Sequence, residues 1–252
     1  MATENSAHLL HAILGLGSTG PASAHDAVTI SIDFENIEGL ATPATNKPPS
    51  GQMGLAILDT RDLYASSGDD NDIIASHNFA FGPPEYLATA QKRFIFGDTS
   101  VVKQENLAMS LQSLVPVSRN IALVAHGVSN ELRALKLLHI DMSLFVGYFD
   151  TNKLPRFILP HSPNHSLKSL LCKLRIPYCN LHSAGNDARF TMLCLLRLAT
   201  KAFEQHGSTP EASKQKMRYL DQIVSRPLPD APGRPLTKEE KKKAKQLRKS
   251  LR

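Results

Sequence analysis

The order of the apolar runs constrains the fold of this chain more than any other feature. Short runs typical of β-strands occupy 28–34, 52–60, 72–81, 120–127 and 145–151. Helical patterns occupy 101–115, 130–140, 166–174 and 186–206. Consecutive strands tend to pair antiparallel, whereas strands separated by helices tend to pair in parallel. The sequence therefore predicts an α/β fold with a mixed central β-sheet, three antiparallel strands followed by parallel strands, flanked by helices.

The basic charge is concentrated at the C-terminal end. The last 16 residues, TKEEKKKAKQLRKSLR, contain eight Lys or Arg and two Glu, and so account for the whole net charge of +6. Such a tail is typical of an electrostatic arm for a polyanion or of a nuclear import signal, and equally of a solvated terminus. We expect a flexible leader over 1–27, one domain over 28–206, a helical extension over 207–226, and a Pro-rich linker with the basic tail over 227–252.

Cysteine content and hydropathy narrow the class of protein. No apolar run approaches the roughly 20 residues of a membrane span, and three cysteines are too few for a disulfide framework or a zinc cage. The first 27 residues contain no Lys or Arg, which argues against a secretory signal and an Arg-rich transit peptide. We expect an intracellular protein of the nucleus or cytoplasm with no membrane partner.

Polar side chains follow the predicted strands at the points where the strands end. Asp33 and Glu35 end the first strand, and because alternate residues share one side of a strand, both acids would lie together and favour a cation. Further polar residues stand at strand ends or helix starts: His126, Glu131, Asp150, Thr151, His182 and Asp187. In an α/β sheet, the residues of a binding or active site usually come from these positions. Taken singly, each has an ordinary structural explanation, such as a turn residue or an acid at a helix N-terminus.

Taken together, the segments DFE, AHGVSNELRAL and HSAGNDARFTM resemble the motifs of the DEDDh 3′ to 5′ exonucleases of the RNase H-like superfamily. FDT at 149–151 and HSLKSLL at 165–171 strengthen the resemblance to its RNA exonuclease branch, and the HSAGNDA segment is also similar to a fungal branch. The resemblance covers about residues 28–204. It implies an RNase H-like fold and hydrolysis of phosphodiester bonds.

The resemblance also implies a catalytic set, whose members are Asp33, Glu35, Glu131, His182 and Asp187. The four acids would hold two Mg²⁺ or Mn²⁺ ions, since hard cations take oxygen ligands and an ion pair about 3.5–4 Å apart stabilises both attacking and leaving oxygens. His182 would take the proton of the attacking water. Glu131 departs from the family pattern, which has Asp at this position, and weakened catalysis is a consequence to test.

The expected substrate contacts are Phe34, Asn36, His126, Asp150 and Arg189. For four of them, a structural role is the alternative to contact with substrate. Phe34 would face away from the acids and belong to the core, and His126 would hydrogen-bond a backbone group. Asp150 would order the site rather than bind metal, and Arg189 would be a surface residue of its helix.

Two hypotheses on function follow. The first is a metal-dependent 3′ to 5′ exonuclease that acts on single-stranded RNA, or DNA, with a free 3′ end and releases nucleoside 5′-monophosphates, with a protein partner in RNA processing. The second is a catalytically weak or inactive RNase H-like module that binds nucleic acid or protein through its basic tail. The presence of all the acids favours the enzyme, whereas Glu131 and the neutral body of the chain favour the module.

Overall fold

The computed structural model describes residues 10, 13–14, 27–36, 48–63, 72–116, 118–159, 165–204 and 211–229. Within them lies a six-stranded sheet in the order β4-β3-β2-β1-β5-β6. Its strands are β1 (Ala27–Glu35), β2 (Gly51–Asp59), β3 (Ile74–Phe81), β4 (Thr99–Val101), β5 (Asn120–Ala125) and β6 (Phe145–Asp150). β1, β2 and β3 are antiparallel neighbours, and β5 and β6 extend the sheet in parallel with β1. The predicted mixed sheet is therefore confirmed.

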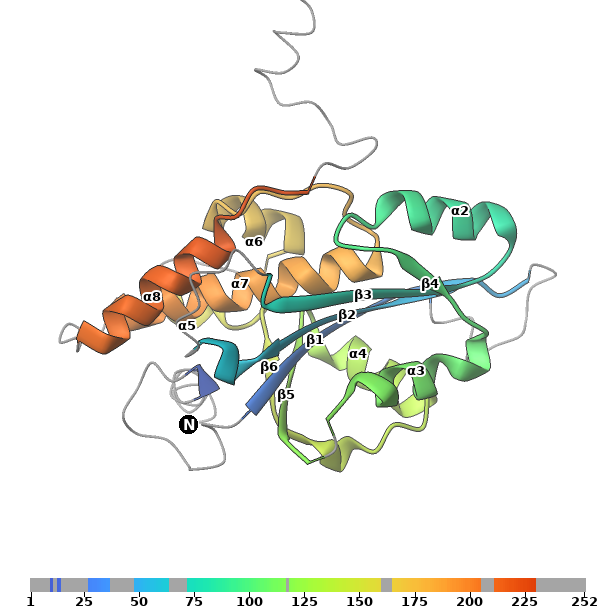
Figure 1. Cartoon of the computed structure of the whole chain (residues 1–252), viewed down its shortest axis with the longest axis horizontal. Helices are drawn as coiled ribbons and strands as arrows, with labels where there is room; N and C mark the ends of the chain where they lie inside the picture. Colours follow the sequence, from blue (N-terminus) through green and yellow to red (C-terminus); the bar gives the residue numbers. More distant parts are fainter. Residues whose placement is uncertain are drawn as a thin grey trace, which may run out of the picture.

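Helices cover both faces of this sheet (Figure 1). They are α2 (Pro84–Arg93), α3 (Leu107–Leu114), α4 (Val128–Leu137), α5 (Pro155–Ile158), α6 (Leu167–Leu174), α7 (Ala184–Glu204) and α8 (Glu211–Val224). Short 3-10 helices are η3 (Thr60–Leu63), η4 (Gln104–Asn106) and η5 (Met142–Leu144). The long helix α7 crosses one face together with α6 and α8, while α3 and α4 lie on the other. Helix α7 contacts β3, β2, β1 and β5, so it packs across the middle of the sheet.

The alternation of side chains along β1 assigns its two faces. Val28, Ile30 and Ile32 pack into the hydrophobic cluster that contains residues of α3 and α4. Thr29 points the other way, and its hydroxyl lies 3.8 Å from the sulfur of Met192 on α7. Because side chains alternate with a period of two, the later odd-numbered residues Asp33 and Glu35 also face α7.

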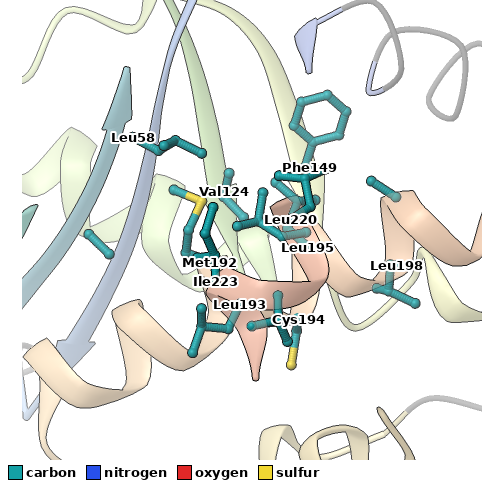
Figure 2. Packing of buried hydrophobic residues seen from close by; sticks show 14 of the residues in the cluster. Leu58, Val124, Phe149, Met192, Leu193, Cys194, Leu195, Leu198, Leu220 and Ile223 are labelled. Carbon is teal, nitrogen blue, oxygen red and sulfur yellow. The ribbon is translucent and has the colours of Figure 1, made fainter. Parts of the chain in front are cut away.

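The core between the sheet and α7 is continuous with α8 (Figure 2). Leu58, Val124 and Phe149 come from three strands, and they meet residues of α7 such as Met192 and Leu195. Nearly every position of α7 is buried, since the sheet covers one side of the helix and α6 and α8 cover others. This burial fixes the start of α7 relative to the strands, which matters for the site.

Residues near both ends of the described chain pack into the core. Leu10, Ile13 and Leu14 are 0–1% exposed and belong to the same core cluster as α7, so these three residues of the expected flexible leader are packed. Helix α8 lies within the expected extension and buries Leu220 and Ile223 in that cluster. The basic tail lies outside the described residues. Among the described helices, none is long and apolar enough to cross a membrane.

The structure also contains α2 and β4, which the sequence interpretation did not include. Helix α2 follows Gly82 and Pro83 and begins with Pro84, a residue favoured in the first turn because it lacks the amide hydrogen that would have no partner there. The helix expected over 101–115 begins at Leu107, because β4 and η4 take up the preceding residues. Three residues of β4 are too few for a strand pattern to be visible.

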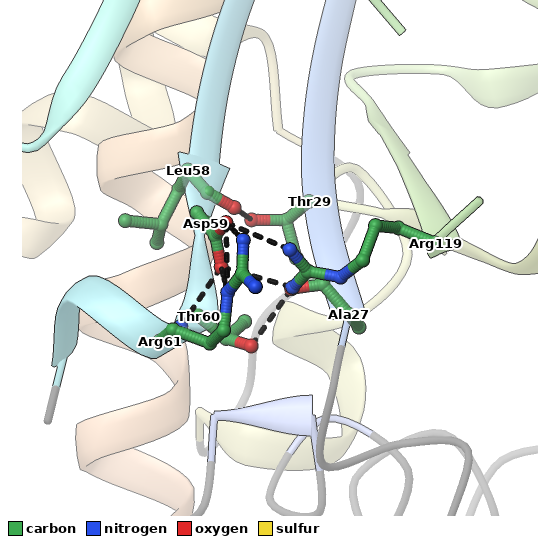
Figure 3. Close-up of polar contacts among 7 residues, drawn as sticks. All are labelled: Ala27, Thr29, Leu58, Asp59, Thr60, Arg61 and Arg119. Atoms are coloured by element: carbon green, nitrogen blue, oxygen red, sulfur yellow. Dashed lines mark hydrogen bonds and ion pairs between the residues drawn. The ribbon is translucent and has the colours of Figure 1, made fainter. Parts of the chain in front are cut away.

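An ionic cluster holds β1 and β2 together at the end remote from Asp33 (Figure 3). The Arg119 guanidinium donates to both oxygens of Asp59 at 2.9 and 3.0 Å, and Arg61 donates to the same carboxylate. Thr60 donates its hydroxyl hydrogen to the carbonyl oxygen of Ala27 at 2.7 Å. These contacts fix the register in which Asp33 lies opposite Gly54 at the other end of the pair.

Candidate active site

Asp33 and Glu35 lie on the part of β1 that extends beyond β5. The parallel pairing of β1 with β5 ends at Ser31, whereas the antiparallel pairing with β2 continues to Glu35. The two acids therefore have a neighbouring strand on one side only. Among the described residues, the edge of β1 beyond Ser31 is therefore not covered by β5.

Close contact between α7 and β2 brings the start of α7 to Asp33. A Cβ atom on Gly54 would lie 1.9 Å from the carbonyl oxygen of Ala184, and one on Gly185 would lie 2.6 Å from the Phe94 ring. Only glycine permits such an approach at both positions. Since Gly54 is the cross-strand partner of Asp33, the first turn of α7 is held beside the acids.

Buried amides fix the first turn of α7. The Asn186 side chain accepts a hydrogen bond from the amide of Ile95 at 3.1 Å and donates to the carbonyl oxygens of Arg93 and Asn180 at 2.8 and 3.0 Å. Asn78 accepts a hydrogen bond from the amide of Gly185 at 3.0 Å. The sequence interpretation missed these positioning residues, although an Asn inside HSAGNDA at the start of an apolar helix was a readable signal.

Three of the predicted site residues form a group suited to a cation. Glu35, His182 and Asp187 each offer one ligand atom, and these atoms lie within 4.8 Å of one another. Nδ1 of His182 lies 3.6 Å from Oε1 of Glu35, and the His182 amide donates to Oδ2 of Asp187 at 3.0 Å. The His182 side chain is 83% exposed, so its ring can be reached by solvent and substrate.

Asp33 and Glu131 are the other two acids of the predicted site, and they share one feature with Asp187. One oxygen each of Asp33, Glu131 and Asp187 is buried and has no hydrogen-bond partner in the described structure. A buried carboxylate oxygen without a partner is costly, whereas a bound divalent cation would satisfy it. Carboxylate oxygens are donors that fit Mg²⁺ or Mn²⁺ better than a soft metal. The residues present therefore fit such an ion.

The electrostatics of the acids agree with a site that requires positive charge. Burial raises the pKa of Asp33 well above its usual value, and the charges of Asp187, Glu131 and Glu35 raise it further. Burial raises the pKa of Glu131 to about 7, with a contribution from Asp150. Burial likewise raises the pKa of Asp187 to about 7, against the opposing hydrogen bond from the His182 amide. A cation among these groups would lower all three pKa values.

Glu131 projects from the first turn of α4 and is 7% exposed. The helix starts after Gly127, which has a left-handed φ of 100° and donates its amide hydrogen to Oδ1 of Asp150 at 3.0 Å. Asp150 accepts a second hydrogen bond from the amide of Asn152 at 2.9 Å. The end of β6 thereby fixes the start of α4 and, through it, the position of Glu131.

His126 contacts protein groups through both ring nitrogens. Nδ1 lies 3.0 Å from the Thr151 hydroxyl, and Nε2 lies 2.8 Å from the carbonyl oxygen of His165. Asn152 donates to the same carbonyl at 2.9 Å. This arrangement ties the ends of β5 and β6 to the start of α6, as the structural alternative for His126 supposed.

The other expected substrate contacts are placed apart from one another. Phe34 packs against the cluster on the face opposite to the acids, and Asn36 is exposed directly after β1 with a left-handed φ of 60°. The structure does not bring Arg189 to the acids. Its guanidinium is buried, donates to both oxygens of Asp72 at 2.7 and 2.8 Å, and lies 5.1 Å from the Phe96 ring centre.

A family model and a relative from fission yeast match this chain. The model of the DEDDh C-terminal domain family, described as DNA polymerase III subunit epsilon-like, matches residues 28–198, about two thirds of the chain. An uncharacterized nucleolar protein of Schizosaccharomyces pombe is 33% identical over 115 residues, which cover 43% of this chain. The chain spans 47%, about half, of that relative.

Two solved structures share the arrangement of the chain to a limited extent. Exonuclease X in complex with 5′ overhanging duplex DNA is 14% identical, with 76% of this chain and 99% of that chain covered and a TM-score of 0.36. Pop2p of S. pombe in its Mg²⁺- and Mn²⁺-bound form is 17% identical, with 80% and 89% covered and a TM-score of 0.40. Neither score carries an inference about function.

Proposed function

The chain belongs to the DEDDh family of DNA polymerase III subunit epsilon-like proteins, and from that premise we propose that it is a metal-dependent 3′ to 5′ exonuclease. One observation carries the proposal. Buried carboxylate oxygens of Asp33, Glu131 and Asp187 without hydrogen-bond partners surround the end of β1, next to the exposed His182. This arrangement is costly without a cation and suited to phosphodiester hydrolysis with one.

The residues divide into ligands and a base. Asp33, Glu35, Glu131 and Asp187 would hold Mg²⁺ or Mn²⁺, two ions as in two-metal nucleases, and the metal supplies stabilisation of the charge that develops on the phosphate. His182 takes a proton from the attacking water at its ring, for which its exposure is necessary. The carboxylate of Glu35, 3.6 Å from Nδ1, stabilises the imidazolium that forms.

We infer that the substrate is single-stranded nucleic acid with a free 3′ end, RNA in preference to DNA, and that nucleoside 5′-monophosphates are released. The resemblance of the second and third motifs to RNA exonucleases supports RNA. The nucleolar relative and the run KKKAKQLRK support a location in the nucleus. We also propose that the protein works together with a protein partner in RNA processing.

A time course with 5′-labelled single-stranded RNA and DNA in Mn²⁺, Mg²⁺ or EDTA tests the proposal. Shortening in single-nucleotide steps, faster for RNA and abolished by EDTA, is expected of the wild-type protein. The Asp33→Asn variant should leave both strands intact, and Asp98→Asn, which changes an exposed acid outside the site, should cut like wild type.

A second candidate is a catalytically inactive module that binds nucleic acid. The observation that favours it is Glu131, whose side chain is one methylene longer than the Asp of the family pattern. Under this candidate the folded protein cuts neither strand in either metal, and salt-sensitive RNA binding disappears when residues 236–252 are deleted.

A further inference from the structure

A pocket lies at the end of β6, the last strand in the order of the described sheet. It has a volume of about 240 Å³ and lies where the end of β6 meets α5. Tyr148, Asp150, Lys153, Arg156 and Phe157 are among the residues that line it. The function proposed above uses none of these side chains except Asp150, so the pocket needs a separate explanation.

Two aromatic rings at this pocket are unusually exposed. Tyr148 is 41% exposed and Phe157 is 52% exposed, although large apolar side chains normally lie inside a protein. Because β6 is the last strand of the sheet, no strand among the described residues pairs with its outer edge. Exposed aromatic rings in a groove are the platforms on which single-stranded bases stack.

Cationic groups accompany the rings. Nζ of Lys153 lies 3.6 Å from Oδ2 of Asp150, and the Lys153 side chain is 62% exposed. Arg156 is exposed and makes no ion pair with any described residue. A guanidinium without a carboxylate partner beside aromatic rings is suited to a phosphate group.

Asp150 lines this pocket and also contacts the start of the helix that carries Glu131. Its carboxylate lines the pocket and accepts the hydrogen bond from Gly127 that starts α4. Glu131 lies in the first turn of that helix. Asp150 is therefore shared by the pocket and by the start of the helix that carries Glu131, which places the pocket next to the proposed metal site.

We propose that this pocket binds a nucleotide of the substrate strand on the 5′ side of the bond that is cut. A base stacks on Phe157 and Tyr148, and Arg156 and Lys153 contact the adjoining phosphate. The inference rests on the proposed function, and it names an additional binding site of that enzyme. Rings and cations in one pocket next to a nuclease site favour nucleic acid over a protein strand added to the edge of β6.

Fluorescence anisotropy with 5′-labelled single-stranded RNA of two and six nucleotides tests this site in the full-length protein. All variants carry Asp33→Asn, so that the strand is not consumed. Phe157→Ala should weaken binding of the six-nucleotide strand about tenfold. The slope of log affinity against log salt concentration, called the salt slope below, should not change, because no charge is removed. Arg156→Ala should weaken binding and reduce the salt slope by about one.

Matched variants control for effects of the substitutions on folding. Phe157→Tyr keeps an aromatic ring and should restore affinity, whereas Met109→Ala, a change at a 61% exposed side chain on α3, should have no effect. If Phe157→Ala binds six nucleotides as tightly as its parent, the site is refuted and a protein partner becomes the expected occupant. Cleavage assays of the same proteins with Asp33 restored separate the exonuclease proposal from the pocket proposal. If the protein cuts RNA but Phe157→Ala does not change the affinity, only the pocket is refuted. Binding lost in Phe157→Ala without any wild-type cleavage refutes the exonuclease and leaves a binding pocket.

Discussion

The backbone of Ala184 lies so close to Gly54 that a Cβ atom on Gly54 would be 1.9 Å from the Ala184 carbonyl oxygen. This contact determines how near α7 lies to the sheet. Asp33 is the cross-strand neighbour of Gly54, and Asp187 lies three residues after Ala184. The distance between two acids of the proposed metal site therefore depends on a residue that has no side chain.

Replacement of Gly54 by Ala should damage both stability and the site. Overpacking commonly costs 1–3 kcal/mol, and we expect a loss of at least about 3 kcal/mol in the free energy of unfolding, because the clash is with backbone that cannot rotate away. Urea denaturation measures the loss. Gly51→Ala is the milder control on the same strand, since its nearest contact, at 2.8 Å, is the end of the Phe81 side chain, and the nearest backbone atom, the Glu35 carbonyl oxygen, is 3.0 Å away. Equal stability of the two variants would contradict the proposed role of Gly54.

Asp33→Asn should remove stabilisation by metal without unfolding the protein. The change replaces a carboxylate whose pKa is raised by burial and by neighbouring acids, so repulsion in the metal-free fold decreases. Wild-type protein should gain about 2.7 kcal/mol at a Mn²⁺ concentration 100 times its Kd, and Asp33→Asn should gain little. Thermal unfolding with Mn²⁺ and with EDTA measures this gain, and Asp98→Asn should behave like wild type. A full Mn²⁺ effect in Asp33→Asn would exclude Asp33 as a ligand.

The metal-free protein should lose stability as the pH rises from about 4.5 to about 7. In this window Glu131 is protonated in the folded protein but ionised in the unfolded chain, because burial raises its folded pKa from 4.5 to about 7. The folded state then binds more protons than the unfolded chain, so the free energy of unfolding falls. Glu131 contributes roughly 2–3 kcal/mol of this fall, beside the contributions of Asp33 and Asp187, whose pKa values burial also raises.

Denaturation in EDTA at a series of pH values measures this slope. Glu131→Gln should make the slope shallower, since an amide does not titrate, and the part due to Asp33 and Asp187 should remain. The exposed Glu105→Gln should retain the wild-type slope. A slope that is the same in Glu131→Gln would show that the Glu131 carboxyl is not the group responsible.

His182→Asn should abolish most catalysis while leaving the fold intact. His182 has a left-handed φ of 64° and an 83% exposed side chain, and Asn accepts this backbone conformation better than most residues. Loss of a general base should reduce kcat by about 10²–10⁴-fold. His139→Asn is the matched control, because His139 is also exposed with a left-handed φ of 54°. Comparable loss in both variants would contradict a catalytic role.

The sequence predicted the elements whose side-chain pattern is set locally. The strands that became β1, β2, β3, β5 and β6 were recognisable as apolar runs, and the alternation along β1 predicted that Asp33 and Glu35 share a face. The mixed order of the sheet followed from where helices interrupt the strands. Helix α2 could have been found from Pro83 and Pro84, and the burial of Leu10, Ile13 and Leu14 from their helical spacing.

Features that depend on distant contacts could not be predicted. Arg189 follows Asp187 by two residues, yet it points to Asp72 and the start of β3, because successive positions of a helix face different directions. The need for glycine at position 54 arises from a helix 130 residues later in the chain. The pocket at β6 combines a strand edge with a short helix, and no sequence motif marked it.

Release of the first product from a 3′-labelled single-stranded RNA tests the central claim most directly. With Mn²⁺, the label should appear at once as a nucleoside 5′-monophosphate, while the rest of the strand stays long, and EDTA or Asp33→Asn should prevent it. Release of labelled fragments several nucleotides long, or no release by folded protein in either metal, would contradict a 3′ to 5′ exonuclease centred on Asp33, Glu35, Glu131 and Asp187.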